Sequence, residues 1–195
     1  MRVRLWAMRT RAFSGEEATR LLSVLPLSER ERLTDGDRLR EDSLWAYSLL
    51  RLVIDESFGM ELPKISRAEG GKPYFPAHPE ICFSISHTDG AVLVGLWDRE
   101  IGVDLEKDRP VPERVRRLLD AGEETFFSEW VRWEACAKCA RKSVLSVLRT
   151  GKLPEDVVYQ PIQIFDGYFV GAAARGETIE PVLSCVDVER LFDGC

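Results

Sequence analysis

The sequence predicts an α+β protein made of two similar halves. Each half of the 195-residue chain begins with an apolar strand, continues through helical segments and ends in a β hairpin. Each half also contains one long helical pattern, over residues 43–58 and about 123–149. We therefore divide the chain into an N-terminal α+β half, residues 1–98, and a C-terminal α+β half, residues 99–195.

The chain is expected to open with a strand and two short helices. Residues 2–8 alternate apolar and basic side chains, as in a half-buried strand. Ser14 with Glu17 forms a capping-box pattern at the start of the first helix, and Pro26 is expected to end it. Ser28 is expected to cap the second helix.

The rest of the first half is predicted to be a helix, a loop and a hairpin. Apolar residues recur at spacings of three and four over residues 43–58, and Gly59 is placed to end that helix. Residues 69–74 are expected to form a loop because they contain two glycines and a proline. Residues 81–97 contain two apolar runs joined by a polar turn at residues 86–90.

The second half is expected to follow the same order. It starts with the apolar strand 101–106 and continues through a short helix at about residues 111–119 and the long helix at about 123–149. Its remaining strands are predicted at residues 157–165, 168–174 and 182–186, with a turn at Asp166 and Gly167.

Composition limits the possible classes of protein. The formal net charge of −6 argues against general nucleic-acid binding. No apolar run approaches the ~20 residues of a membrane-spanning helix, and no secretory signal is visible, so we expect a cytoplasmic protein that does not bind membranes. Cys136 and Cys139 form a C-x-x-C pair without a second pair at zinc spacing, so helix packing is favoured over a metal or redox site.

Two carboxylates in strand 101–106 are the first candidates for chemistry. Asp104 and Glu106 are two residues apart and therefore project to the same side of an extended chain. Carboxylates held side by side repel each other unless a cation neutralises them, and a hard divalent ion such as Mg²⁺ suits an oxygen pair.

The long helix supplies a third carboxylate. Trp130, Glu134 and Lys138 follow at spacings of four and share one helix face. Taken alone, Glu134 and Lys138 are best explained as an ordinary salt bridge on a helix surface.

The loop at residues 69–74 and the turn at 86–90 add cationic and polar groups. Lys72, between Gly71 and Pro73, could meet a phosphate where the glycines let a ligand approach the backbone. His87 could donate to a phosphate, although in isolation a solvent-facing turn histidine is the simpler interpretation. His78 is interpreted as a loop residue without a functional role.

In order along the chain, four motifs resemble those of the 4'-phosphopantetheinyl transferases of the Sfp-like type. They cover roughly residues 68–140 and are Gly71-Lys-Pro73, Phe83-Ser-Ile-Ser-His87, Ile101-Gly-Val-Asp-Leu-Glu106 and Trp130-x-x-x-Glu134-x-x-x-Lys138. The resemblance implies a holo-[acyl-carrier-protein] synthase, which moves the phosphopantetheine arm of coenzyme A (CoA) to a serine of an acyl or peptidyl carrier protein. It also implies a pseudo-dimer of two similar α+β halves with the site between them.

The resemblance further implies roles for individual residues. Mg²⁺ would be held by Asp104, Glu106 and Glu134. On chemical grounds, Glu134, acting directly or through a metal-bound water, is the candidate base for the serine hydroxyl, and Lys138 would neutralise charge, so these two are the candidate catalytic residues. The residues that would contact CoA are Lys72, Pro73, Ser86, His87, Thr88 and Lys138.

Two departures from the family pattern remove positive charge. Trp133 stands where the family helix has a lysine, and Trp45 stands where an arginine helps to hold the CoA nucleotide. Compensating charge is expected from Arg30, Arg38 or Arg40. These departures keep open an alternative hypothesis, a divergent member that binds CoA or a carrier protein with weak or no transferase activity.

The partner is expected to be an acidic apo carrier protein. An acidic transferase needs a local basic surface to meet it. Arg114, Arg116 and Arg117 are the candidates, with a solvated helix face as the alternative interpretation. We expect a monomer.

Overall fold

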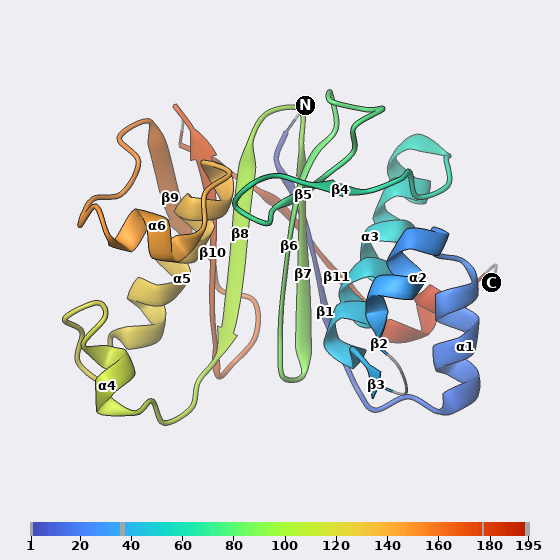
Figure 1. The fold of residues 1–195 in the computed structure, drawn as a ribbon, viewed down its shortest axis with the longest axis horizontal. Coiled ribbons are helices and arrows are strands. Elements are labelled where there is room, and N and C mark those ends of the chain that lie inside the picture. Colours follow the sequence, from blue (N-terminus) through green and yellow to red (C-terminus); the bar gives the residue numbers. More distant parts are fainter. Residues whose placement is uncertain (1, 36–37, 177, 194–195) are drawn as a thin grey trace.

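The computed structural model describes residues 2–35, 38–176 and 178–193, and it confirms an α+β protein. Strands occupy the middle, with α1–α3 at one end of the long axis and α4–α6 at the other (Figure 1). Up to residue 98 the elements are β1 (Arg4–Arg9), α1 (Gly15–Ser23), α2 (Leu27–Leu33), β2 (Thr34–Asp35), β3 (Arg38–Leu39), α3 (Glu41–Phe58), β4 (Ser66–Arg67), β5 (Pro73–Tyr74), β6 (Cys82–Thr88) and β7 (Ala91–Trp97). They are followed by β8 (Ile101–Lys107), α4 (Glu113–Arg116), α5 (Phe126–Cys139), α6 (Val144–Leu148), β9 (Val157–Pro161), β10 (Tyr168–Arg175), β11 (Val182–Val186) and the 3₁₀ helix η1 (Val188–Phe192).

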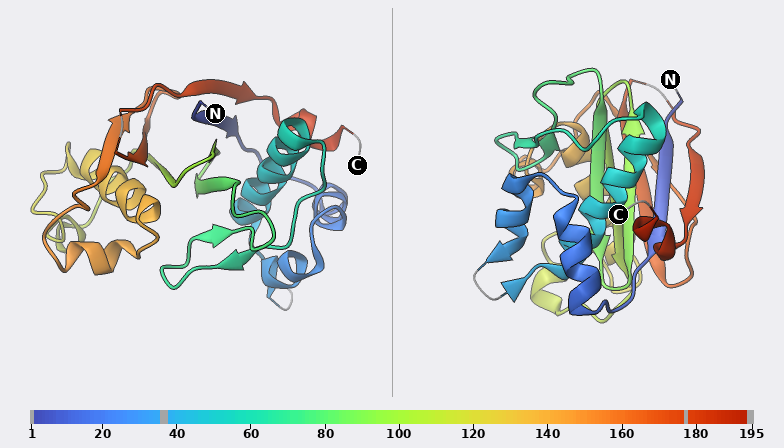
Figure 2. Two further views of the ribbon diagram at one scale, coloured as in Figure 1. Left: turned by 90° about the horizontal axis from the view of Figure 1, so that it is seen from above. Right: turned by 90° about the vertical axis from the view of Figure 1, so that its right-hand side faces the viewer.

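The strands form two main sheets. One has the order β11-β1-β7-β6 and the other the order β8-β10-β9. All neighbours are antiparallel except β11, which runs parallel to β1 and brings the last strand beside the first (Figure 2). The division at residues 98 and 99 stays a prediction, but this pairing places part of the C-terminal tail in the first sheet.

Buried apolar residues form three layers that hold the sheets and helices together. Helix α3 packs against the first sheet through residues such as Leu50, Met8 and Val94. Leu5 and Leu93 of the first sheet pack with Val103 and other residues of the second. Helix α5 covers the second sheet through Ala135, Cys136 and Cys139, which lie against Ala173 of β10. The two sheets are thus enclosed between helices.

Side-chain hydroxyls connect the sheets where β6 meets β8. The backbone N–H of Val103 donates to Ser84 Oγ at 3.0 Å, and that of Leu105 donates to Ser86 Oγ at 3.3 Å. A buried backbone N–H needs a partner, so the two serines replace the ladder that a neighbouring strand would supply. We call this contact the β6–β8 seam.

Several local predictions are confirmed. Ser14 caps α1 and forms a complete capping box with Glu17, and α3 ends at Gly59, which has φ of 63°. The prediction for Ser28 is wrong: it lies inside α2, and Pro26 occupies the N-cap.

The prediction of one helix over residues 123–149 is wrong. Helix α5 starts only at Phe126 and ends at Cys139, and α6 starts at Val144. Between them Arg141 has a left-handed φ of 56°, and the Ser143 side chain accepts the Ser146 N–H to cap α6. A left-handed residue followed by a new cap ends one helix and begins another.

Four further predictions differ from the structure. Strand β6 continues through Thr88, so the turn predicted at residues 86–90 contracts to Asp89 and Gly90. Within the predicted loop, Pro73 and Tyr74 pair with Ser66 and Arg67. In the second half, the predicted helix at 111–119 is the single turn α4 with no buried residue, and β9 ends at residue 161.

Within the described residues, no helix combines the length and apolarity needed to cross a membrane.

Gly102 of β8 marks the closest approach of α5 to the second sheet. An added Cβ there would lie 1.9 Å from the Ala135 carbonyl oxygen and 2.5 Å from the Cys139 nitrogen, both backbone atoms of α5. We expect Gly102→Ala to lower the free energy of unfolding in urea by about 2 kcal/mol or more, because α5 must move off the sheet. The matched control is Gly15→Ala, whose Cβ would meet nothing within 4 Å. Equal stability of the two variants would contradict this packing.

Candidate active site

The predicted site residues gather around one cavity of about 560 Å³ that lies along the β6–β8 seam. It is lined from α2, α3, β4, β5, β6, β8, α5 and α6, and from the loops before β5 and after α5. Of the predicted site residues, those that line it are Lys72, Pro73, Ser86, His87, Asp104, Glu106, Glu134 and Lys138. Thr88 is not among the lining residues, but its hydroxyl donates to Glu106 Oε2 at 3.2 Å.

Asp104 is the most enclosed acid of the cavity, with 4% of its surface exposed. Its Oδ1 accepts hydrogen bonds from Ser86 Oγ and Lys138 Nζ, both at 2.6 Å. Its Oδ2 is buried and has no partner. A buried carboxylate oxygen without a partner is costly, so Oδ2 is a position where a ligand would lower the energy of the site.

Lys138 connects α5 to both sheets. Besides Asp104, its ammonium contacts Ser86 Oγ at 3.3 Å and donates to the Val103 carbonyl at 3.2 Å. The salt bridge with Glu134, the simplest interpretation of their spacing, is not found between these described residues. Glu134 and Lys138 share one helix face, and the Lys138 ammonium forms its salt bridge with Asp104 instead.

The acids of the cavity influence one another. Burial raises the pKa of Glu134, and the nearby Asp104 and Glu106 raise it further, whereas Lys138 opposes them. Glu106 accepts from Arg109 Nη1 at 2.8 Å in addition to Thr88. Glu134 therefore holds its proton more strongly than an exposed glutamate does.

The donor chemistry of the three carboxylates suits Mg²⁺. All of the ligands would be oxygens, as a hard cation requires, and Asp104 Oδ2 has no other partner. Within residues 2–35, 38–176 and 178–193, no three side chains of His, Cys, Asp or Glu already stand close enough together to hold a metal ion.

Lys72 is anchored at the edge of the cavity. Lys72 is 8% exposed, and its ammonium donates to Glu100 Oε2 at 2.8 Å and to the Ile101 carbonyl at 2.7 Å. An ammonium has three donors, so one remains for a ligand. The sequence did not point to Glu100, because a charged residue between two strands is usually a solvated turn.

His87 lines the cavity from strand β6 rather than from a turn, and its side chain is also exposed to solvent, as the simpler interpretation expected. Burial lowers the pKa of its ring, and the nearby Lys138 and Arg32 add to this, against the opposing charge of Asp42. Its Nε2 lies 3.3 Å from Ser43 Oγ. The ring is therefore neutral near pH 7 and can exchange a hydrogen bond.

Sequence reasoning missed the arginines of the cavity. Arg32 and Arg67 line it and both contact Glu29, which is 1% exposed. The Arg32 Nη2 atom is buried without a partner. Arg30, which was expected to supply charge, instead binds the carbonyls of residues 23 and 25. Because residues two apart lie on different faces of a helix, only one of Arg30 and Arg32 could have faced the cavity.

The other residues considered from the sequence lie elsewhere. Arg40 is exposed at the N-cap of α3, and the Arg38 side chain lies outside the described part of the chain. Trp45 is 2% exposed, packs against Phe13 and donates from its indole N–H to the Arg11 carbonyl. It is therefore a core residue. Cys136 and Cys139 are free, buried thiols of the helix packing, and burial raises the pKa of each, to about 11 and about 12.

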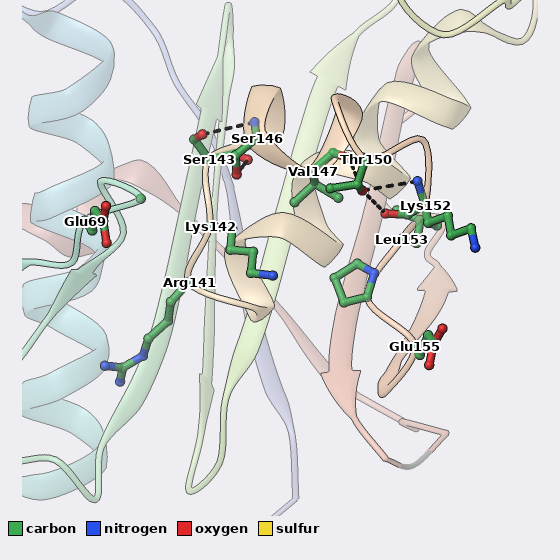
Figure 3. A pocket seen from close by; sticks show the side chains of 12 residues that line it. Glu69, Arg141, Lys142, Ser143, Ser146, Val147, Thr150, Lys152, Leu153 and Glu155 are labelled. Atoms are coloured by element: carbon green, nitrogen blue, oxygen red, sulfur yellow. Dashed lines mark hydrogen bonds between the residues drawn. The ribbon is translucent and has the colours of Figure 1, made fainter.

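A second hollow of about 570 Å³ adjoins the cavity across Lys142 and Ser143 (Figure 3). It lies between Gly70, the turn after α5, and the segment that follows α6. In Figure 3 the Arg141 side chain extends away from Lys152 and Glu155. Arg141 thus stands at the border between the hollow and the loop that carries Lys72.

Comparison with curated proteins finds 4'-phosphopantetheinyl transferases. The transferase ffp of Bacillus subtilis is 36% identical over 61% of this chain and 52% of its own length. The transferase Sfp of Bacillus subtilis (strain 168) is 32% identical over 55% of this chain and 50% of its own length. The transferase AcpT of Escherichia coli O157:H7 is 30% identical over 64% of this chain and 69% of its own length.

These matches differ in how much of each relative they cover. The chain spans about half the length of the Bacillus subtilis relatives, with 46%, 52% and 50% of three such proteins aligned. It covers more than two thirds of the Escherichia coli relative. No family model matches the chain.

The raised pKa of Glu134 predicts a pH-dependent stability. A carboxyl with a folded pKa above its ordinary value of 4.5 stabilises the fold below that value, and this contribution is lost as the pH rises through the folded pKa. In EDTA, we expect Glu134→Gln to unfold at higher urea than wild type at pH 7, and the gain to shrink at pH 4.

The matched control is Glu129→Gln on the same helix, because the Glu129 side chain is 42% exposed. This variant should differ from wild type by the same amount at both pH values. A Glu134→Gln effect that does not change with pH would contradict the burial of the Glu134 charge.

Proposed function

This chain belongs to the 4'-phosphopantetheinyl transferase family, and we propose that it transfers the phosphopantetheine arm of CoA to a serine of an apo acyl or peptidyl carrier protein. The observation that carries the proposal is the cavity along the β6–β8 seam. It is lined by the acids Asp104, Glu106 and Glu134 together with the basic side chains Lys138, Lys72 and His87. Phosphoryl transfer requires acidic side chains that can bind a divalent cation and, beside them, cationic or hydrogen-bonding side chains that can bind phosphates.

The two sheets support the proposed pseudo-dimer. In the first, the strand order β1-β7-β6 places the last strand of the three between the other two. In the second, β8-β10-β9 has the same arrangement. Helix α3 covers the first set and α5 the second. We therefore infer two halves of equivalent topology, with the catalytic cavity between them.

The proposed reaction needs no nucleophile from this chain. The carrier serine oxygen would form a bond to the phosphorus that bears pantetheine, and the bond from that phosphorus to the bridging oxygen would break. The electron pair leaves with adenosine 3',5'-bisphosphate. The serine proton passes to Glu134, which burial makes a better proton acceptor.

Asp104, Glu106 and Glu134 would hold Mg²⁺, which supplies positive charge for the pyrophosphate. Lys138, already bound to Asp104, would add charge on the same side. Lys72 offers its remaining donor to a phosphate, and neutral His87 offers a hydrogen bond. Pro73 and Ser86 line the same cavity, while Thr88 donates a hydrogen bond that would orient Glu106.

Arg32 and Arg67 would replace the charge missing at Trp45 and Trp133. Both line the cavity, and the unpartnered Arg32 Nη2 is the donor best placed for an anionic group of CoA. The alternative, a member that binds CoA without transferring its arm, is not favoured, because the matched relatives are named as transferases. A monomer in the cytoplasm, without nucleic-acid or membrane binding, remains part of the proposal.

The proposal is tested by incubating the protein with CoA, Mg²⁺ and apo carrier proteins and weighing the carriers by mass spectrometry. We expect the mass of the phosphopantetheine arm to be added. Asp104→Asn should lower the rate at least about a hundredfold, because it removes the charge of the most enclosed acid. Asp108→Asn, an exposed position just after β8, is the matched control.

Two outcomes of that assay would contradict the proposal. Mg²⁺-dependent CoA binding by calorimetry, without transfer to any of several carriers, would establish the alternative function. Full activity of a folded Asp104→Asn variant would remove Asp104 from the metal site.

The carrier is proposed to meet Arg114, Arg116 and Arg117. Arg117 is 76% exposed and pairs with Glu113, and Arg116 lies 3.9 Å from Glu123. We expect the double variant Arg114→Glu and Arg117→Glu to raise KM for an acidic carrier about tenfold, because rim charges steer association, and to leave the CoA dissociation constant unchanged. The control is Arg175→Glu, at the C-terminal end of β10. An unchanged KM would assign these arginines to a solvated surface.

A further inference from the structure

Glu100 joins two cations that come from distant parts of the chain. Its Oε2 accepts from Lys72 Nζ at 2.8 Å, and its Oε1 accepts from Arg141 Nε at 2.7 Å and lies 2.6 Å from Arg141 Nη2. We call Lys72, Glu100 and Arg141 the ionic clasp. None of the three side chains contacts the three acids proposed to hold the cation.

The clasp is partly removed from water. The Lys72 side chain is 6% exposed, that of Glu100 22%, and that of Arg141 44%. Burial would raise the pKa of Glu100, but hydrogen bonds and charge from Arg141 and Lys72 lower it. Enclosed pairs of this kind are screened less by salt than exposed ones. The clasp therefore holds its members more firmly than a surface ion pair would.

Two further contacts press the same segments together. The Arg141 guanidinium lies over the Tyr74 ring, 5.5 Å from its centroid. Gly70 packs against the turn after α5 so closely that a Cβ would lie 2.6 Å from the Arg141 carbonyl oxygen. The loop of Gly70 and Lys72 is thus docked on that turn by charge, ring contact and shape.

The position of the clasp connects it to the cavity. Glu100 directly precedes β8, which carries Asp104 and Glu106. Arg141 follows α5, which carries Glu134 and Lys138. Lys72 belongs to the segment between β4 and β5, which is distant in sequence from both of these elements. One carboxylate therefore ties the lysine-bearing loop to both elements that bear the acids.

We propose that Glu100 is a positioning residue that holds the Lys72 ammonium at the edge of the cavity, with its remaining N–H available to a CoA phosphate. This inference rests on the proposed function. A lysine side chain that is free to move loses rotamer entropy when a ligand fixes it. Glu100 and the Ile101 carbonyl fix Lys72 before CoA arrives, which favours binding by preorganisation.

The test compares Glu100→Gln with Glu80→Gln, a change at a side chain that is 67% exposed and lies 3.3 Å from His78 Nδ1. Two quantities are measured: the dissociation constant for CoA with Mg²⁺ by calorimetry, and hydrogen–deuterium exchange of residues 66–74 without ligand. We expect Glu100→Gln to weaken CoA binding about tenfold, as loss of a charged hydrogen bond predicts. Exchange of residues 66–74 should accelerate, and Glu80→Gln should match wild type in both.

The two measurements separate failure of this inference from failure of the proposed function. Unchanged CoA binding and exchange in Glu100→Gln, beside a wild type that binds CoA, would overturn the role of Glu100. Faster exchange of residues 66–74 in Glu100→Gln with unchanged CoA binding would mean that Glu100 has a structural role and does not position Lys72 for CoA. Absence of CoA binding by wild type would instead overturn the proposed function, and exchange alone would then decide whether Glu100 anchors the loop.

A second variant covers the case in which Glu100→Gln does not fold. Arg141→Gln removes the more exposed partner and leaves the contact between Lys72 and Glu100 in place. We expect a smaller loss of CoA affinity and faster exchange of residues 66–74. Wild-type behaviour of Arg141→Gln in both measurements would contradict the clasp.

Discussion

The contact between Asp104 and Lys138 is the interaction on which the rest of the site depends. Asp104 is 4% exposed, and an enclosed carboxylate is tolerated only when it is paired and hydrogen-bonded. Lys138 and Ser86 satisfy one of its oxygens, and the other has no partner. Because these three residues come from α5, β6 and β8, the need to neutralise one charge fixes the relative position of the helix and both sheets.

The β6–β8 seam explains why there is a cavity at this place. Two strands joined by a backbone ladder would form one continuous sheet. Here Ser84 and Ser86 accept the N–H groups of Val103 and Leu105, so β8 remains the edge of its own sheet while its buried donors are satisfied. The serine that replaces a ladder bond is also the serine that contacts Asp104. Ser86 therefore helps to keep the two sheets separate and also orients Asp104.

The sequence could predict those structural features that depend on residues close together in the chain. The capping box of α1, the end of α3 at Gly59 and the shared face of Asp104 and Glu106 follow from short-range rules and could be predicted. The break after α5 depends on a left-handed Arg141 beside the closely packed Gly70, a tertiary contact that local propensity does not encode. The pairing of β11 with β1 and the two contacts of Glu100 join residues far apart in the chain, so no local pattern could reveal them.

The distribution of charge around the cavity follows from the same constraints. The acids stand on β8 and α5, whereas Arg32 and Arg67 approach from α2 and β4 on the other side, where both bind the enclosed Glu29. Glu29 cannot remain buried and charged without these two arginines. Arg32 and Arg67 therefore neutralise Glu29 and also place positive charge at the cavity. Trp45, where a family arginine is expected, is then free to serve the core, packed against Phe13. The positive charge that Arg32 and Arg67 bring to the cavity therefore comes from side chains that also neutralise the buried Glu29 of the first half.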